Sequence, residues 1–170
     1  MNIEKELRDA ILRLGAVTDL VVARVWDEWF RNERLPAIVY EIDSETEQNG
    51  LDGRSDMILA EANIICRAKT RKESRELAEA VRTNGTSPAS GLAGWFGRTG
   101  ATAVTDRGGV DVIDRAGNRV YAGRDDDQTY TFTAWLEDKQ TAAVPRVAGG
   151  NEYWYDTNMS FGLQWREAMR

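Results

Sequence analysis

Apolar and polar residues alternate along the last part of the chain. From 153 to 165 the odd-numbered positions are apolar or aromatic apart from Thr157, and the even-numbered positions are mostly polar apart from Trp154. Because successive side chains of a strand point to opposite faces of a sheet, this pattern predicts one long strand with a core-facing side and a polar side. Gly162 lies within this strand, and we expect a bend or a bulge there.

Two other segments have the three- and four-residue spacing of an amphipathic helix. The first spans 3–14 and has Asn2 as its expected N-cap. The second opens with a capping box made by Thr70 and Glu73, and it ends at Asn84, a residue that tolerates the left-handed conformation of a helix end. A further helical turn is expected over 17–23, entered at Thr18 or Asp19, with a short strand at 24–26 after it.

Strand patterns at 37–45 and 57–67 flank a cluster of turn residues at 49–53. This arrangement predicts an antiparallel hairpin. The segment 129–136 also alternates, and we expect it to pair with the final strand across a polar connection at 137–152.

Two less regular stretches precede that last hairpin. The segment 85–100 is rich in Gly and Ser and contains Leu92, Trp95 and Phe96, so we expect a loop that carries its own hydrophobic anchor. In 102–127 a small hairpin fits the pattern.

The order of these elements predicts an α+β fold. Two helices would pack on one face of a mainly antiparallel sheet, with an inserted β-hairpin or loop region before the last long hairpin. A chain of 170 residues, 42% of them hydrophobic, is long enough for one core and short for two. We therefore expect residues 1–170 to form a single domain, with 97–127 as an insertion.

The composition argues against most familiar catalytic chemistry. The chain has no histidine, the usual general base near neutral pH, and only one cysteine, Cys66, which we assign to the core. Its net charge of -6 and pI near 4.8 argue against a surface that grips nucleic acid. Neither a signal-peptide pattern nor a membrane-spanning apolar run is present in the sequence, so we expect neither export nor membrane insertion.

Two acidic clusters are candidate metal sites. Glu41, Asp43 and Glu45 fall in one register of a predicted strand and could hold Mg²⁺, although a solvated acidic face is the commoner explanation. The three aspartates at 125–127 lack the spacing of a calcium loop, and we expect a solvated turn there. No glycine-rich phosphate loop occurs in the sequence. We therefore predict no cofactor, no metal and no enzymatic activity.

Four segments carry a resemblance to a known family. They are the amphipathic helix 3–14, the strand entry LPAIVY at 35–40, the helix 73–82 with its core LAEAVR at 77–82, and the closing strand 153–167, which ends in FGLQWRE. In these segments and in their order the chain resembles the tail-completion family of long-tailed bacteriophages, which includes tail terminators and tail-to-head joining proteins. The resemblance runs nearly end to end, and none of its motifs is catalytic.

The resemblance implies a structural virion protein of the tail or neck, present in the host cytoplasm during assembly. Members of that family form a hexameric ring at the head-proximal end of the tail tube, stop its growth and join the tail to the head connector. The implied partners are further copies of the chain, the tail tube protein and the connector or neck protein. DNA would pass through the ring without specific binding, which suits an acidic subunit because a negative lumen repels phosphates.

The expected contact residues lie on aromatic loops, on the acidic turn and on the polar side of the last strand. They are Trp29, Phe30, Trp95, Phe96, Asp125, Asp126, Asp127, Asp156, Asn158, Gln164 and Arg166. The insertion 97–127 departs from the family pattern, and we expect it to reach a neighbouring subunit, the tube or the connector. The alternatives are another neck, head-completion or minor tail ring protein, and a small cellular binding module. An enzyme is the least favoured class.

Overall fold

The computed structural model describes residues 3–29, 34–48, 57–94, 96–98, 102–103, 121–122 and 131–166. The elements within these ranges are, in chain order, α1 (Ile3–Leu12), α2 (Gly15–Val21), β1 (Val25–Asp27), β2 (Ala37–Gln48), β3 (Met57–Ala68), α3 (Arg71–Thr83), the 3₁₀ turns η1 (Pro88–Ser90) and η2 (Leu92–Gly94), β4 (Phe96–Arg98), β5 (Thr102–Ala103), β6 (Tyr121–Ala122), β7 (Thr131–Pro145) and β8 (Tyr153–Arg166). No helix in this described part of the chain is long and apolar enough to cross a membrane.

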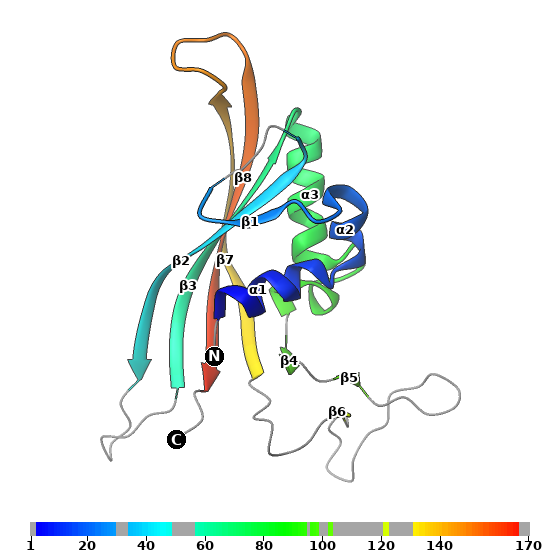
Figure 1. Cartoon of the computed structure of the whole chain (residues 1–170), viewed down its shortest axis with the longest axis vertical. Coiled ribbons are helices and arrows are strands. Elements are labelled where there is room, and N and C mark those ends of the chain that lie inside the picture. Colours follow the sequence, from blue (N-terminus) through cyan, green and yellow to red (C-terminus); the bar gives the residue numbers. More distant parts are fainter. Residues whose placement is uncertain are drawn as a thin grey trace.

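Six strands form one sheet in the order β1-β2-β3-β8-β7-β4 (Figure 1). Strand β1 lies parallel to β2, and all other neighbours are antiparallel. The two predicted hairpins are confirmed as β2–β3 and β7–β8, and β3 pairs with β8 along its whole length. The predicted α+β class is therefore correct.

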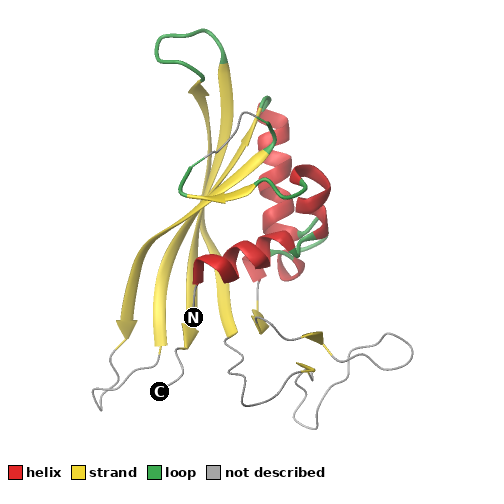
Figure 2. Ribbon diagram, in the orientation of Figure 1, coloured by secondary structure: helices red, strands yellow, loops and turns green. Residues whose placement is uncertain are grey.

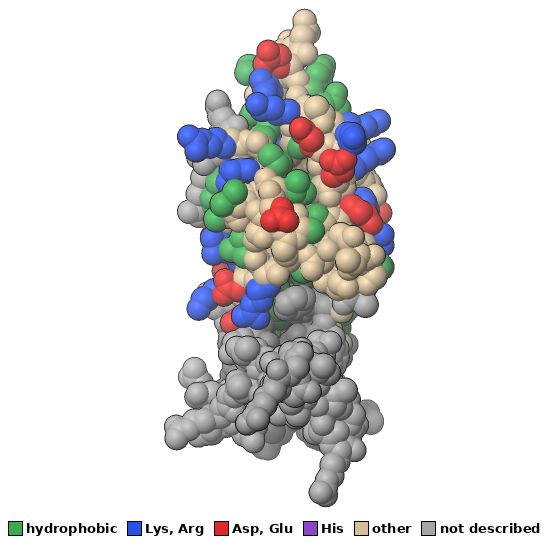
Figure 3. All heavy atoms as spheres, turned by 90° about the vertical axis from the view of Figure 1, so that its right-hand side faces the viewer, with side chains coloured by type: hydrophobic (Ala, Val, Ile, Leu, Met, Phe, Trp, Pro, Cys, Tyr) green, Lys and Arg blue, Asp and Glu red, His purple; other side chains and the backbone are tan. Residues whose placement is uncertain are grey.

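The α-helices cover one face of this sheet (Figure 2). The described residues hold three α-helices where the sequence predicted two packed helices, because the short turn expected at 17–23 is a helix, α2, that joins the same layer. Acidic and basic side chains are interspersed over the outer surface of the layer (Figure 3). Among the described residues, no helix lies on the opposite face of the sheet (Figure 2).

Helix α2 begins earlier than the sequence predicted. It starts at Gly15, without a side-chain cap, and not at Thr18 or Asp19. The missing cap is supplied by another helix, since the Asn84 side chain at the end of α3 accepts the backbone N–H of Ala16 at 3.1 Å. A polar group distant in sequence therefore satisfies a helix end that lacks its own capping residue.

Helix α3 has the ends that the sequence predicted. The Thr70 hydroxyl accepts the N–H of Glu73 at 3.2 Å, and the Glu73 carboxylate accepts the N–H of Thr70 at 3.3 Å, which completes the capping box. Asn84 follows the helix in the left-handed conformation, with φ of 50°.

The core is built on one register of the two central strands. In β3 the buried residues facing the helices are Ile58, Ala60, Ala62, Ile64 and Cys66. In β8 they are Thr157, Met159, Phe161, Leu163 and Trp165. The predicted apolar side of the last strand is thus confirmed from Thr157 onward, and so is the core position of Cys66. The prediction was wrong at the start of the strand, where Tyr153 is 46% exposed and Tyr155 is partly exposed.

Strand β7 is longer than predicted. The polar stretch after 136 was expected to be a connection, yet the strand continues to Pro145, and the connection is only 146–152. The reason is pairing with β8, which is equally long and supplies partners up to Tyr153. Polar residues such as Gln140 lie on the open side of the ribbon, so their polarity does not end the strand.

Two bulges lie at the same height on either side of the central strands. One falls at Asp43 of β2 and the other at Glu137 of β7, where each strand has one residue more than its partner. Gly162 is near this level but has no bulge of its own, contrary to expectation. The indole of Trp135 lies across it, and a Cβ there would come within 2.2 Å of the ring, so the glycine leaves room for an aromatic side chain.

The segment between α3 and β7 is described only in part. Leu92 is fully buried, which confirms one of the three anchor residues predicted for the 85–100 loop. Part of that loop is the short strand β4, which lies beside β7. In the expected insertion, β5 pairs with β6 as a separate two-stranded ladder. The rest of 102–127, with most of the hairpin predicted there, lies outside the described residues.

Candidate interaction surface

The helix-free face of the sheet, here called the open face, is formed by the other register of the same strands. In β8 it carries Asp156, Asn158, Ser160, Gly162 and Gln164, the register predicted to be polar. Asn158 is exposed, whereas Ser160 and Gln164 are partly buried. The Ser160 hydroxyl donates to the Glu61 carboxylate of β3 at 2.9 Å. Along β8 the open face is therefore polar and tied to β3 by cross-strand contacts, whereas in β2 and β3 the same face also carries Val39, Leu59 and Ile65.

Asp156 differs from the prediction, because it is not a solvated surface residue. It is 6% exposed and pairs with Arg67 of β3, whose Nε donates to Oδ1 at 2.8 Å and Nη2 to Oδ2 at 2.7 Å. The Arg67 guanidinium also lies over Trp154 at 4.6 Å from the ring centroid, and that of Arg146 lies 5.7 Å from it. In this cluster a bidentate ion pair packs against an aromatic ring, and the ion pair links β3 to β8.

The acidic residues of β2 do not share a face as predicted. The bulge at Asp43 changes the register, so Glu41 pairs with Asn63 on the open face while Glu45 pairs with Ala60 on the helix side. The Asp43 side chain accepts a hydrogen bond from Asn63. The Mg²⁺ site that needed three acids on one face is thus contradicted by this geometry. Within the described ranges no cluster of three metal-ligating side chains occurs.

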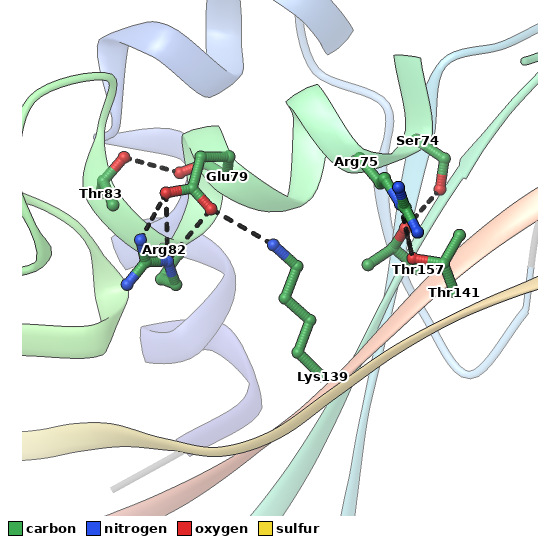
Figure 4. Close-up of polar contacts among 8 residues, drawn as sticks. All are labelled: Ser74, Arg75, Glu79, Arg82, Thr83, Lys139, Thr141 and Thr157. Carbon is green, nitrogen blue, oxygen red and sulfur yellow. Dashed lines mark hydrogen bonds and ion pairs between the residues drawn. The ribbon is translucent and has the colours of Figure 1, made fainter. Parts of the chain in front are cut away.

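On the helix side, a chain of hydroxyl groups runs from the core to the surface (Figure 4). Ser74 donates to the Cys66 carbonyl at 2.8 Å, and its oxygen lies 2.7 Å from that of Thr157. Thr157 lies 3.1 Å from Thr141, which accepts from Arg75 Nε at 3.5 Å. Because a carbonyl only accepts and a guanidinium only donates, every hydroxyl in between must donate toward Cys66. Each buried hydroxyl is thereby satisfied, and the chain joins α3 to β7 and β8.

A shallow groove rich in positive charge lies beside this chain, between α3 and β7. It is lined by Arg71, Lys72, Arg75, Glu76, Glu79 and Lys139. Glu79 accepts from Arg82 at 2.5 Å and from Lys139 Nζ at 3.2 Å (Figure 4). The hydrogen bond from Arg82 is the main reason that the pKa of Glu79 is lowered; partial burial opposes the shift, and Lys139 adds to it.

The other predicted contact residues are dispersed. Trp29 is 67% exposed just after β1. Phe96 lies in β4, paired with Thr133, and Arg166 ends β8; the structure describes their backbone positions only. Phe30, Trp95 and the aspartates at 125–127 lie outside the described residues. The structure therefore brings together Asp156, Asn158 and Gln164 of the predicted set, all from β8.

Sequence reasoning missed several residues of these surfaces. Arg67, Arg146 and Trp135 lie in polar registers or connections, where single residues give no periodic signal. Trp154 did give one, as the aromatic exception on the polar side of the last strand. The cations of the groove come from α3 and β7, which are far apart in the sequence and come together only in the folded protein.

The fold and these surfaces define an α+β protein with a one-sided sheet, an open polar and aromatic face, and a cationic groove. No protein-family model matches the chain, and a search of curated proteins found no match.

Proposed function

We propose that this protein is a structural ring subunit of a long-tailed bacteriophage, which ends tail tube growth and joins the tail to the head connector. The observation that carries the proposal is the one-sided sheet. All the described α-helices cover one face, and the long strands leave the other face open as a broad surface. Such a subunit offers a face and two strand edges to neighbours without needing a catalytic site.

The order of elements supports the proposal, because the helix, hairpin, helix and closing hairpin of the resemblance are all present. The open face also has a composition suited to contact. It combines exposed Asn158 with the 40% exposed Trp135 and the cation–aromatic cluster at Trp154. Aromatic and arginine side chains are enriched at protein interfaces.

A second candidate is a small cellular binding module that uses the same open face. The exposed aromatic Trp135 on that face would suit it equally well. It differs in assembly, since a binding module would remain a monomer and would not recognise tail tubes.

The test is negative-stain electron microscopy of the purified protein with and without tail tubes of its virus. We expect sixfold rings, or tubes of fixed length that carry a cap at one end. Bare tubes together with a protein that stays monomeric under both conditions would contradict the proposal and favour the binding module.

A further inference from the structure

In the part of the chain that the structure describes, the two outer long strands of the sheet, β2 and β7, are each paired on their outer side over a short stretch. Among the described residues, β1 pairs with 38–40 of β2, and β4 pairs with 131–133 of β7. Within the described ranges, no further strand pairs with 41–48 on one side of the sheet or with 134–145 on the other, so these stretches are the candidate edges for an added strand. Such edges accept further strands, and proteins normally cover or charge them.

The directions of these edges are compatible with each other. Strands β2, β3, β8 and β7 alternate in direction, so β2 and β7 run in opposite senses. If β2 of one copy lay beside β7 of the next, the pair would be antiparallel and the helix layers would stay on the same side. This contact is head-to-tail, the type that generates a ring when the rotation closes.

The stretches 41–48 of β2 and 134–145 of β7 lie at different levels along the strand direction. Glu45 is level with Ala134 through the row Glu45–Ala60–Leu163–Ala134, so the β2 stretch lies toward the end where β4 covers β7. Full pairing therefore shifts each copy along the strand direction by several residues. A stagger of this kind is what closing a sheet into a ring requires.

The charges of the two edges are complementary. Glu45 and Glu47 are exposed and lie on the helix side of β2, since they pair with Ala60 and Ile58. On the same side of β7 lies the groove, which has four cations, Arg71, Lys72, Arg75 and Lys139, and two carboxylates, Glu76 and Glu79. Glu79 is already held by Arg82 and Lys139, so the groove has an excess of positive charge.

We propose that residues 41–48 of one copy add to 134–145 of β7 in the next copy, with Glu45 and Glu47 against the cations of the groove. This inference rests on the proposed ring function and names the contact that joins the subunits. The partner is a second copy of this chain.

Cysteine cross-linking tests this contact directly. Strands β2 and β7 are separated by β3 and β8, about 14 Å at the usual strand spacing, which exceeds the reach of a disulfide within one chain. The native Cys66 is fully buried and burial raises the pKa of its thiol, so it does not compete. Glu45→Cys and Lys139→Cys variants with tags of different size are mixed and oxidised, and Glu47→Cys and Thr141→Cys cover neighbouring registers.

We expect disulfide heterodimers between a β2 variant and a β7 variant in at least one of the four combinations. Homodimers alone, or no cross-link in any combination, would overturn the inference. Electron microscopy of the wild-type chain keeps the two proposals apart. If rings or capped tubes form but no cross-link appears, the ring function is supported and the proposed contact is wrong. If cross-links appear but the chains neither close into rings nor cap tubes, the contact is supported and the ring function is wrong.

A charge exchange provides an independent test. Glu45→Lys/Glu47→Lys and Arg75→Glu/Lys139→Glu should each lose assembly alone, because like charges then meet at every contact. Their equimolar mixture should restore it, because alternating copies then have opposite charges at each contact. Native mass spectrometry reads both outcomes, with Arg13→Glu, an exposed charge change near the end of α1, as the control. Assembly of the single variants, or failure of the mixture to assemble, would contradict the contact.

Discussion

The two faces of the central strands β3 and β8 use alternate residues of the same segments for different purposes. On the helix side Met159, Phe161 and Leu163 have no exposed surface, whereas their neighbour Asn158 on the open face is exposed. Burial of apolar surface is the main favourable term in folding. The helix-side register therefore fixes the fold, whereas the open-face register of these two strands is less buried and is exposed at Glu61 and Asn158.

The two faces also differ in how their buried polar side chains are hydrogen-bonded or paired. The helix side buries Ser74 and Thr157 and satisfies them in a directed hydrogen-bond chain. The open face buries one polar side chain of β8, Asp156, and holds it in an ion pair with Arg67. Among the polar side chains that β8 presents on the open face, Asp156 is thus the one whose burial links it to the stability of the fold.

The largest difference is expected for truncation on the helix side. Phe161→Ala should lower the free energy of unfolding by about 3–5 kcal/mol, because it removes a fully buried ring and leaves a cavity. Asn158→Ala, on the opposite face of the same strand, should change it by less than about 0.5 kcal/mol. Urea denaturation measures both values. Equal effects for the two variants would mean that the faces are not separated in this way.

Asp156→Asn should be the costliest change on the open face, at about 2–3 kcal/mol. The substitution removes the charge that balances Arg67, whose side chain is only 16% exposed, and a largely buried charge without its partner is destabilising. Urea denaturation of Asp156→Asn beside Asn158→Ala checks this expectation. If both variants were as stable as the wild type, the ion pair would be of no structural importance.

Ser74→Ala should destabilise the protein by about 1–2 kcal/mol. It removes the hydroxyl that donates to the Cys66 carbonyl and that accepts from Thr157, in a buried region. Ser90→Ala is the matched control, because Ser90 is exposed and its hydroxyl lies 3.2 Å from that of Ser87. Thermal unfolding of the two variants should separate them by several degrees; coincident curves would argue against the hydroxyl chain.

The smallest effect concerns Glu79 in the groove. Because its pKa is lowered in the folded protein, its ionised form contributes stability above the ordinary value of 4.5, and the contribution is lost as the pH falls through the folded pKa. Its side chain is 45% exposed, so the contribution is less than about 0.5 kcal/mol after screening. The difference in unfolding free energy between wild type and Glu79→Gln should shrink as the pH falls below 4.5. A difference that grew toward acid would have the wrong sign.

Local patterns in the sequence predicted much of the fold. Alternation identified both hairpins, and the capping box placed the start of α3, because these signals depend on residues close together in the chain. The length of β7, the bulge at Asp43 and the burial of Asp156 depend on the partner strands, so the local sequence could not reveal them. The cationic groove was missed for the same reason, since α3 and β7 meet only in the folded chain.

The central claim is that the open face serves contact with a partner and not folding. Asn158→Lys/Gln164→Lys places two charges on that face, and its effect is measured by scoring capped tail tubes in electron micrographs alongside the free energy of unfolding. Under the proposed function, we predict that the variant keeps the stability of the wild type to within about 1 kcal/mol and does not cap tail tubes. A variant that unfolds, or one that caps tubes as the wild type does, would contradict the claim.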